Sequence, residues 1–251
     1  MRYLYIFLAM LIVPAAFAST VVDLETQKPV PFAKITIPQK NYETYTDENG
    51  TFNLDATVEG QSIISVEKEG YRPYSLTVDS DSASKPIIMG VEKSELQDIV
   101  LDTDVIHIGD DNYAQTSANS GEFRVKSVGP FYTKTFKMSA DSLKRENYLV
   151  LGSVIGLDTK LAREMGQNKI VNSYASPTEI FFNGNKISEL HLNGDGQRIR
   201  LPNNLIRPDN MNEITIKTGK NLMQTAYIDY DDIEIMNLSI QSGKTSIGYS
   251  D

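Results

Sequence analysis

Short β-strand patterns constrain this chain more than any other feature of its sequence. Val, Ile, Thr and Tyr alternate with polar residues in brief runs, and Gly, Pro, Asn and Asp stand between the runs, which is typical of strands joined by turns. The clearest turn is Asp47–Gly50, where Gly50 can take the positive φ of a tight hairpin. In the first part of the chain, strands are predicted at Ser19–Asp23, Ala33–Ile37, Glu43–Thr46, Thr51–Leu54, Ser62–Glu67, Tyr74–Val78 and Pro86–Met89.

The same kind of pattern continues beyond Asp102 without repeating the earlier sequence. The stretch Asp79–Pro86 is predicted as a loop or linker, and Leu157–Gln167 as the one short helix. The length of 251 residues allows two ordinary domains. We therefore predict an all-β chain with one sandwich at residues 19–101 and another at residues 102–251. Strands of the second are predicted at Gly121–Val128, Tyr132–Met138, Tyr148–Val154, Glu179–Phe182, Lys186–Leu190, Gln197–Leu201, Glu213–Thr218 and Asp232–Ile240.

The first residues have the pattern of a cleavable secretory signal. Arg2 supplies the positive start, Leu4–Val13 is apolar apart from one tyrosine, and Pro14 precedes the small-residue end Ala16-Phe17-Ala18, which is an A-x-A cleavage pattern. The apolar run is too short for a bilayer span, which needs about 20 residues. Residues 1–18 are therefore predicted to be a signal peptide, against the alternative of a buried N-terminal strand or helix.

Cysteine content and charge narrow the location and the partners. The chain has no cysteine and a formal net charge of −9. Small extracellular domains usually rely on disulfides, so a long exported chain without them suggests a periplasmic or secreted bacterial protein that is stable through its core. An acidic surface repels nucleic acid and anionic lipid headgroups, so neither is expected as a partner, and no later stretch is apolar enough to span a membrane.

Residues 20 to about 90 carry a recognisable arrangement of turn and core residues. Thr46-Asp47 is followed by Gly50 and Phe52, and Gly70-Tyr71 comes downstream. This arrangement resembles the carboxypeptidase regulatory-like domain, a transthyretin-like sandwich of seven strands. The resemblance implies a folding and spacing module of exported proteins, and it does not imply peptidase activity. From the residues alone, we expect Asp47 to accept hydrogen bonds from the turn amides, Phe52 to enter the core and Tyr71 to lie against the sandwich edge.

The second part of the chain carries a different series of motifs. A hairpin at Asn183-Gly184 is followed by a turn at Pro202, an Asn212–Ile216 strand and the closing segment Tyr230–Leu238. This order is similar to the galactose-binding-like jelly roll, the sandwich of many carbohydrate-binding modules. The resemblance implies that the first and last strands are neighbours. The typical surface tryptophans of such modules are missing, since the chain has no tryptophan.

Acidic residues near both ends of this second part are candidates for a structural calcium site. Asp110 and Asp111 would meet Asp231 or Asp232 if the first and last strands are neighbours, and Ca²⁺ takes six to eight oxygen ligands. The alternative is that these aspartates are solvated turn residues. Glu234 alternates with two isoleucines, so it is expected on the solvent face of its strand.

Sugar binding needs an aromatic ring beside hydrogen-bonding side chains. Arg198 and Arg200 share one strand face and are candidates for clamping an acidic sugar. The alternative is that most of the tyrosines pack within the fold. The preferred ligand contacts are Tyr113, Asn112, Asn183, Arg198 and Tyr230.

No catalytic motif is visible. The two histidines, His107 and His191, lie outside any recognisable arrangement of acid, base and nucleophile. The sequence therefore predicts a non-catalytic exported binding protein that recognises carbohydrate, a polysaccharide or other glycan, through its second sandwich. The alternative is a structural or adhesive module that pairs with other proteins of the bacterial envelope.

Overall fold

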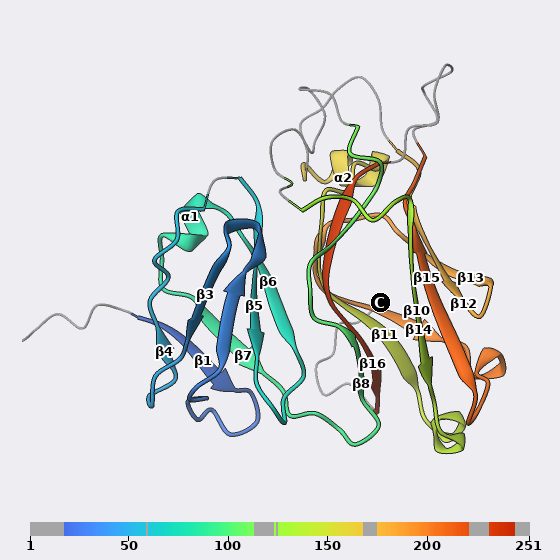
Figure 1. Cartoon of the computed structure of the whole chain (residues 1–251), viewed down its shortest axis with the longest axis horizontal. Coiled ribbons are helices and arrows are strands. Elements are labelled where there is room, and N and C mark those ends of the chain that lie inside the picture. Colours follow the sequence, from blue (N-terminus) through green and yellow to red (C-terminus); the bar gives the residue numbers. More distant parts are fainter. Residues whose placement is uncertain are drawn as a thin grey trace, which may run out of the picture.

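The computed structural model describes residues 18–58, 60–112, 123, 125–167, 175–220 and 231–243. These residues form two β-sandwiches that lie side by side (Figure 1). Each sandwich has its own apolar core. The prediction of an all-β chain with two sandwich domains is confirmed.

The first sandwich has the seven strands that the sequence predicts. One sheet has the order β4-β1-β7, with β1 and β7 parallel, and the other has the antiparallel order β3-β2-β5-β6. A short helix, α1 (Ser80–Ala83), forms in the stretch predicted as a loop, because Asp79 and Ser82 make a capping box. The strands are β1 (Ser19–Asp23), β2 (Lys34–Ile37), β3 (Tyr42–Tyr45), β4 (Thr51–Phe52), β5 (Ser62–Glu67), β6 (Tyr74–Val78) and β7 (Ile88–Val91).

The hallmark residues of this sandwich have the predicted structural roles. The Asp47 carboxylate accepts hydrogen bonds from the backbone amides of Asn49 and Thr51, at 2.8 and 2.9 Å. Gly50 has a φ of 70°, and a side chain there would collide with the backbone of the neighbouring segment. Phe52 is buried in the core, and the Tyr71 hydroxyl donates to Asp23 at 3.0 Å.

The second sandwich is a jelly roll. Its sheets have the orders β10-β15-β12-β13 and β14-β11-β16-β8, and β9 also pairs with β16. If β8 and β9 are counted as one strand, each sheet has four antiparallel strands. Their order along the chain is that of two Greek keys, which defines a jelly roll. The strands are β8 (Ile99–Asp102), β9 (Ile106–Ile108), β10 (Phe131–Lys137), β11 (Asn147–Ile155), β12 (Thr178–Phe182), β13 (Asn185–Leu190), β14 (Gly194–Leu201), β15 (Met211–Lys217) and β16 (Ile233–Ser242).

Two predicted elements of this sandwich differ from the structure. The helix expected at Leu157–Gln167 shortens to α2 (Lys160–Glu164), which Thr159 caps. In the predicted strand Gly121–Val128, the described residues 125–128 form no strand. Backbone hydrogen bonds join Val128 to His107 and Gly109 to Gly129. The Ser127 amide donates to the Asp111 carboxylate instead, so this pairing does not extend into a strand. Two short 3-10 helices, η2 (Ala140–Lys144) and η3 (Asn203–Leu205), complete the sandwich.

The strands β11 and β16 carry a matched irregularity at their centre. Gly152 and Asn237 lie opposite one another in the register of the pair, and Asn237 has a φ of 57° inside its strand. Before this point the odd-numbered residues Ile233 and Ile235 of β16 face the core, and after it the even-numbered residues Leu238 and Ile240 do. Met236 and Asn237, although consecutive, therefore both lie outside the apolar core of the second sandwich.

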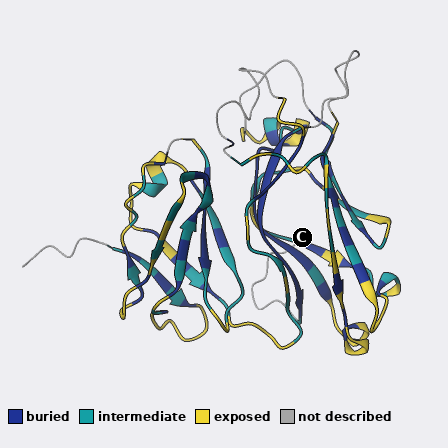
Figure 2. Cartoon of the chain, in the orientation of Figure 1, coloured by how far each residue is buried: buried dark blue, intermediate teal, exposed yellow. Residues whose placement is uncertain are grey.

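The outer face of the β14-β11-β16-β8 sheet is covered by the first sandwich. Strand β6 contacts β11, β14 and β16, and every residue of β16 is buried. Figure 2 shows buried residues on the strands of both sandwiches that face one another. We call this region the interdomain interface. Ile63 of β5 packs there against Ile155 and Met236 in a small apolar cluster.

Most other contacts at the interdomain interface are hydrogen bonds between side chains. The Ser153 hydroxyl contacts the Ser75 hydroxyl at 3.0 Å, and the Asn237 amide donates to the Ser65 hydroxyl at 2.9 Å. At the rim, the Thr77 hydroxyl donates to Asp195 at 2.8 Å. Because polar groups excluded from water need partners, this pattern fixes how one sandwich lies on the other.

Candidate binding site

One end of the second sandwich brings together segments that are far apart in the sequence. The backbone amide of Asp111, just after β9, donates to the Asp232 carboxylate at 2.9 Å, just before β16. Asp110 accepts from the Asn112 amide at 2.9 Å. The predicted meeting of the first loop with the last strand is therefore present. We call this region the loop end.

His107 lies at the centre of the loop end and is fully buried. Its Nδ1 is 2.5 Å from the Val125 carbonyl oxygen, and its Nε2 is 2.7 Å from the Asp232 carboxylate. A carbonyl oxygen only accepts, so Nδ1 carries a proton. The ring of Phe123 packs against the imidazole with centroids 4.6 Å apart. His107 therefore joins three segments of the loop end.

The charge of His107 follows from these contacts. Burial lowers the pKa of His107, but the hydrogen bonds to Asp232 and Val125 and the charges of Asp232 and Glu234 outweigh burial, so the pKa is raised above its ordinary value. The raised pKa favours the protonated ring, in which both nitrogens donate. Sequence reasoning missed His107 because no motif surrounds it. Its alternation with Ile106 and Ile108 indicates only that it faces away from the core.

The four aspartates predicted as calcium ligands lie in two groups around this histidine. Asp110 and Asp111 follow β9, while Asp231 and Asp232 precede β16. Ligand atoms of His107, Asp111 and Asp232 lie within 4.8 Å of one another. When it is protonated, the imidazole of His107 offers no lone pair to a metal and supplies positive charge next to Asp232. Calcium binding at the carboxylates stays a prediction.

The prediction that Glu234 faces solvent is wrong. Glu234 is fully buried, and its Oε2 accepts a hydrogen bond of 2.8 Å from Nε2 of Gln39 in the first sandwich. The alternation along β16 correctly places Glu234 away from the core of the second sandwich. The first sandwich covers that face, which no local pattern indicates.

The predicted sugar contacts do not meet at one place. Asn183 lies in the turn between β12 and β13, where its amide bonds to Leu205, Asn212 and Glu213. Arg198 lies on the outer face of β14, stacks on the Tyr148 ring at 4.6 Å and donates to Gln241.

Only part of that set lies at the loop end. Asn112 is exposed there. Tyr113 and Tyr230 lie outside the described residues, and they are the sequence neighbours of Asn112 and Asp231. Arg200, the neighbour of Arg198 on the same face, is 3.4 Å from Glu146 and lines an open hollow with Pro202, Asn203 and Asn204.

The second histidine has different contacts from His107. His191, between β13 and β14, is exposed and lies 3.3 Å from Glu189. His107 and His191 therefore contact different carboxylates, Asp232 and Glu189.

In the part of the chain that the structure describes, no helix has the length and apolar character of a membrane span.

Comparison with known families supports the first sandwich. Residues 19–101 match the model of the CarboxypepD_reg-like domain, and this match confirms the resemblance seen in the sequence. The domain is of a non-catalytic type. No curated protein matches the chain. The galactose-binding-like resemblance of the second sandwich stays a prediction.

Proposed function

We propose that this protein is an exported, non-catalytic binding protein that recognises carbohydrate at the loop end of its second sandwich. The observation that carries the proposal is the contact between Asp111 and Asp232, which brings the segment after β9 beside the segment before β16. Loops that are gathered at one end of a rigid β-sandwich are a common place for ligand contacts. The jelly-roll order of the strands is compatible with this use.

Residues next to these two segments in the sequence supply the side chains that sugar binding needs. Tyr113 follows Asn112, and Tyr230 precedes Asp231. A sugar ring presents a CH-rich face, which stacks on an aromatic ring, and hydroxyls, which need amide or carboxylate partners. Asn112 is exposed at the loop end, so it is the polar partner in this proposal.

A glycan array probed with the mature chain tests this function, followed by calorimetry on each polysaccharide that binds. Tyr113→Ala and Tyr230→Ala are expected to weaken binding about tenfold, because an aromatic stacking contact contributes about 1 kcal/mol beyond the area it buries. Tyr45→Ala is the matched control, since Tyr45 is exposed on the first sandwich. A clean negative across neutral and acidic polysaccharides would overturn the proposal.

Export is the second part of the proposal. The first strand, β1, begins at Ser19, immediately after the cleavage site proposed at Ala18. Expression in a bacterial host, fractionation and intact-mass measurement test it. We expect a periplasmic or secreted product that begins at Ser19. A cytoplasmic product of full length would contradict export while leaving carbohydrate binding open to the array.

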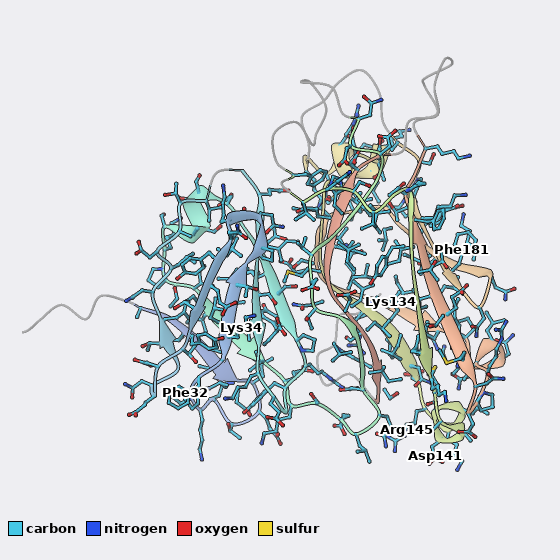
Figure 3. All side chains as sticks on the ribbon, in the orientation of Figure 1. Phe32, Lys34, Lys134, Asp141, Arg145 and Phe181 are labelled. Carbon is cyan, nitrogen blue, oxygen red and sulfur yellow. The ribbon has the colours of Figure 1, made fainter. Side chains whose placement is uncertain are left out.

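An interaction with envelope proteins is the second candidate function. The outer face of the β10-β15-β12-β13 sheet exposes apolar side chains, including Phe131 at 59 % and Met211 at 42 %. Figure 3 shows Phe181 on the same sheet. Phe131 and Met211 lie at opposite ends of the β10–β15 pair, and exposed apolar side chains on an open sheet face favour contact with another protein. A Phe131→Ser variant that loses a cross-linked envelope partner, together with a negative glycan array, would support this function over the first.

A further inference from the structure

We propose that Gln39, a residue of the first sandwich, positions the loop end of the second sandwich through Glu234 and His107. The contact crosses the interdomain interface. Only the last step of this inference, its effect on a ligand, rests on the proposed function. The order of the loop end itself can be measured without any ligand.

Gln39 is held in one orientation. It follows Pro38 in the short helix η1 (Pro38–Lys40) and is buried. Its Oε1 accepts from the Ile63 backbone amide at 3.3 Å, and its Nε2 donates to Glu234 at 2.8 Å. An amide N–H only donates and a carboxylate only accepts, so both partners fix the same orientation of the carboxamide. Gln39 therefore joins the backbone of β5 to a carboxylate of β16.

Glu234 connects this contact to His107. The two residues are directly opposite in the β9–β16 ladder, and side chains so placed lie on one face with Cβ atoms about 5 Å apart. The carboxylate of Glu234 therefore attracts the imidazole of His107. A buried carboxylate needs a donor, and Gln39 provides one.

His107 then holds the loop. Its Nε2 contacts Asp232 at 2.7 Å, and the same carboxylate oxygen accepts the Asp111 amide at 2.9 Å. Gly109 allows this close approach, because a side chain there would lie 2.2 Å from that oxygen. The contacts form one path from the first sandwich to the segment that precedes the proposed ligand contacts.

The chain contains a built-in control for a test of this path. It has only two histidines, and His191 lies exposed on the surface, where it contacts Glu189. We would record the imidazole resonances and the backbone amide resonances of residues 109–112 by NMR in the mature protein. Gln39→Met keeps the length of the side chain and removes its N–H donor. Thr77→Val is the matched variant, because it removes the hydroxyl contact with Asp195 at the same interface and leaves the backbone amide contacts in place.

Both variants are expected to lower the unfolding temperature, and only Gln39→Met is expected to shift the His107 resonances and the amides of residues 109–112. Glu234→Gln, which keeps an acceptor for Gln39, is expected to shift the same resonances, and it decides the matter if Gln39→Met does not fold. The proposal is overturned if these resonances stay unchanged in the folded variants, or if Thr77→Val shifts them equally.

The effect on a ligand is measured separately. For a polysaccharide identified on the array, Gln39→Met is expected to weaken binding about fivefold or more, the usual range of coupling between sites, while Thr77→Val leaves affinity unchanged. Unchanged affinity with shifted His107 resonances would overturn this last step alone. An array without any binder would overturn the proposed function and leave the NMR result standing.

Discussion

The two sheets of the second sandwich share one core and differ in what covers their outer faces. In the β10-β15-β12-β13 sheet, outward residues such as Thr133 and Lys137 of β10 are exposed. In the β14-β11-β16-β8 sheet, every residue of β16 is buried. The same alternation of apolar and polar residues therefore produces a solvated face on one sheet and an interface on the other.

Polar residues of the two outer faces find their partners differently. On the exposed face, Thr133 contacts Thr215 at 2.8 Å within the same sheet. On the covered face, Ser153 and Asn237 contact residues of the first sandwich. A hydrogen bond removed from water leaves unsatisfied groups when one partner is lost. The covered face should therefore be much more sensitive to substitution than the exposed one.

The largest effect is expected at Gly152. Its φ is not in the left-handed region, and a Cβ atom there would lie 2.5 Å from the Ser75 hydroxyl and 2.7 Å from Cβ of Asn237. Gly152→Val should therefore force the sandwiches apart and cost about 3 kcal/mol of unfolding free energy. Thr215→Val, on the exposed face, should cost less than about 0.5 kcal/mol. Denaturant titration compares them, and equal costs would contradict the difference between the faces.

A smaller effect is expected from two matched hydroxyl pairs. A double-mutant cycle of Ser75→Ala and Ser153→Ala should give a coupling of about 1 kcal/mol, because both hydroxyls are buried. The same cycle with Thr133→Ala and Thr215→Ala should give about 0.3 kcal/mol, at the low end for cross-strand pairs. If the exposed pair coupled as strongly as the buried pair, burial would not be the cause of the difference.

The pH dependence of the unfolding free energy should distinguish the contribution of His107 from that of His191. The pKa of His107 is raised in the folded state, so its contribution to stability is complete below its ordinary value of 6.5 and is lost as pH rises through the folded pKa. His107→Gln should remove this loss from the curve of unfolding free energy against pH. In His191→Gln the loss should remain. A curve that changes in His191→Gln instead would contradict the role of His107.

The smallest effect is expected from calcium. At pH 6, protonated His107 supplies positive charge beside Asp232 and should weaken the predicted calcium site, so millimolar calcium is expected to raise the unfolding temperature by only about 1 °C relative to chelator. No rise at all would contradict the predicted site at Asp110, Asp111, Asp231 and Asp232.

Sequence reasoning predicts the strands well because each strand depends on local alternation. It places the hairpin at Asp47–Gly50 and the contact of the first loop with the last strand. It cannot place Glu234 or Gln39, because their environment is created by a sheet from the other sandwich, 195 residues away in sequence. Residues without a motif, such as His107, gain significance only from three-dimensional neighbours.

The irregularity at Gly152 and Asn237 has a consequence for how this fold can change over evolution. At this point the inward-facing residues of both strands change parity, from Leu151 to Val154 and from Ile235 to Leu238. Deleting Gly152 alone, or Asn237 alone, would therefore remove the extra residue from one strand only and shift the pairing of β11 with β16 by one residue beyond that point. Deleting both would give two regular strands in unchanged register. We therefore expect relatives of this protein either to carry both extra residues or to lack both, as insertions that compensate for one another.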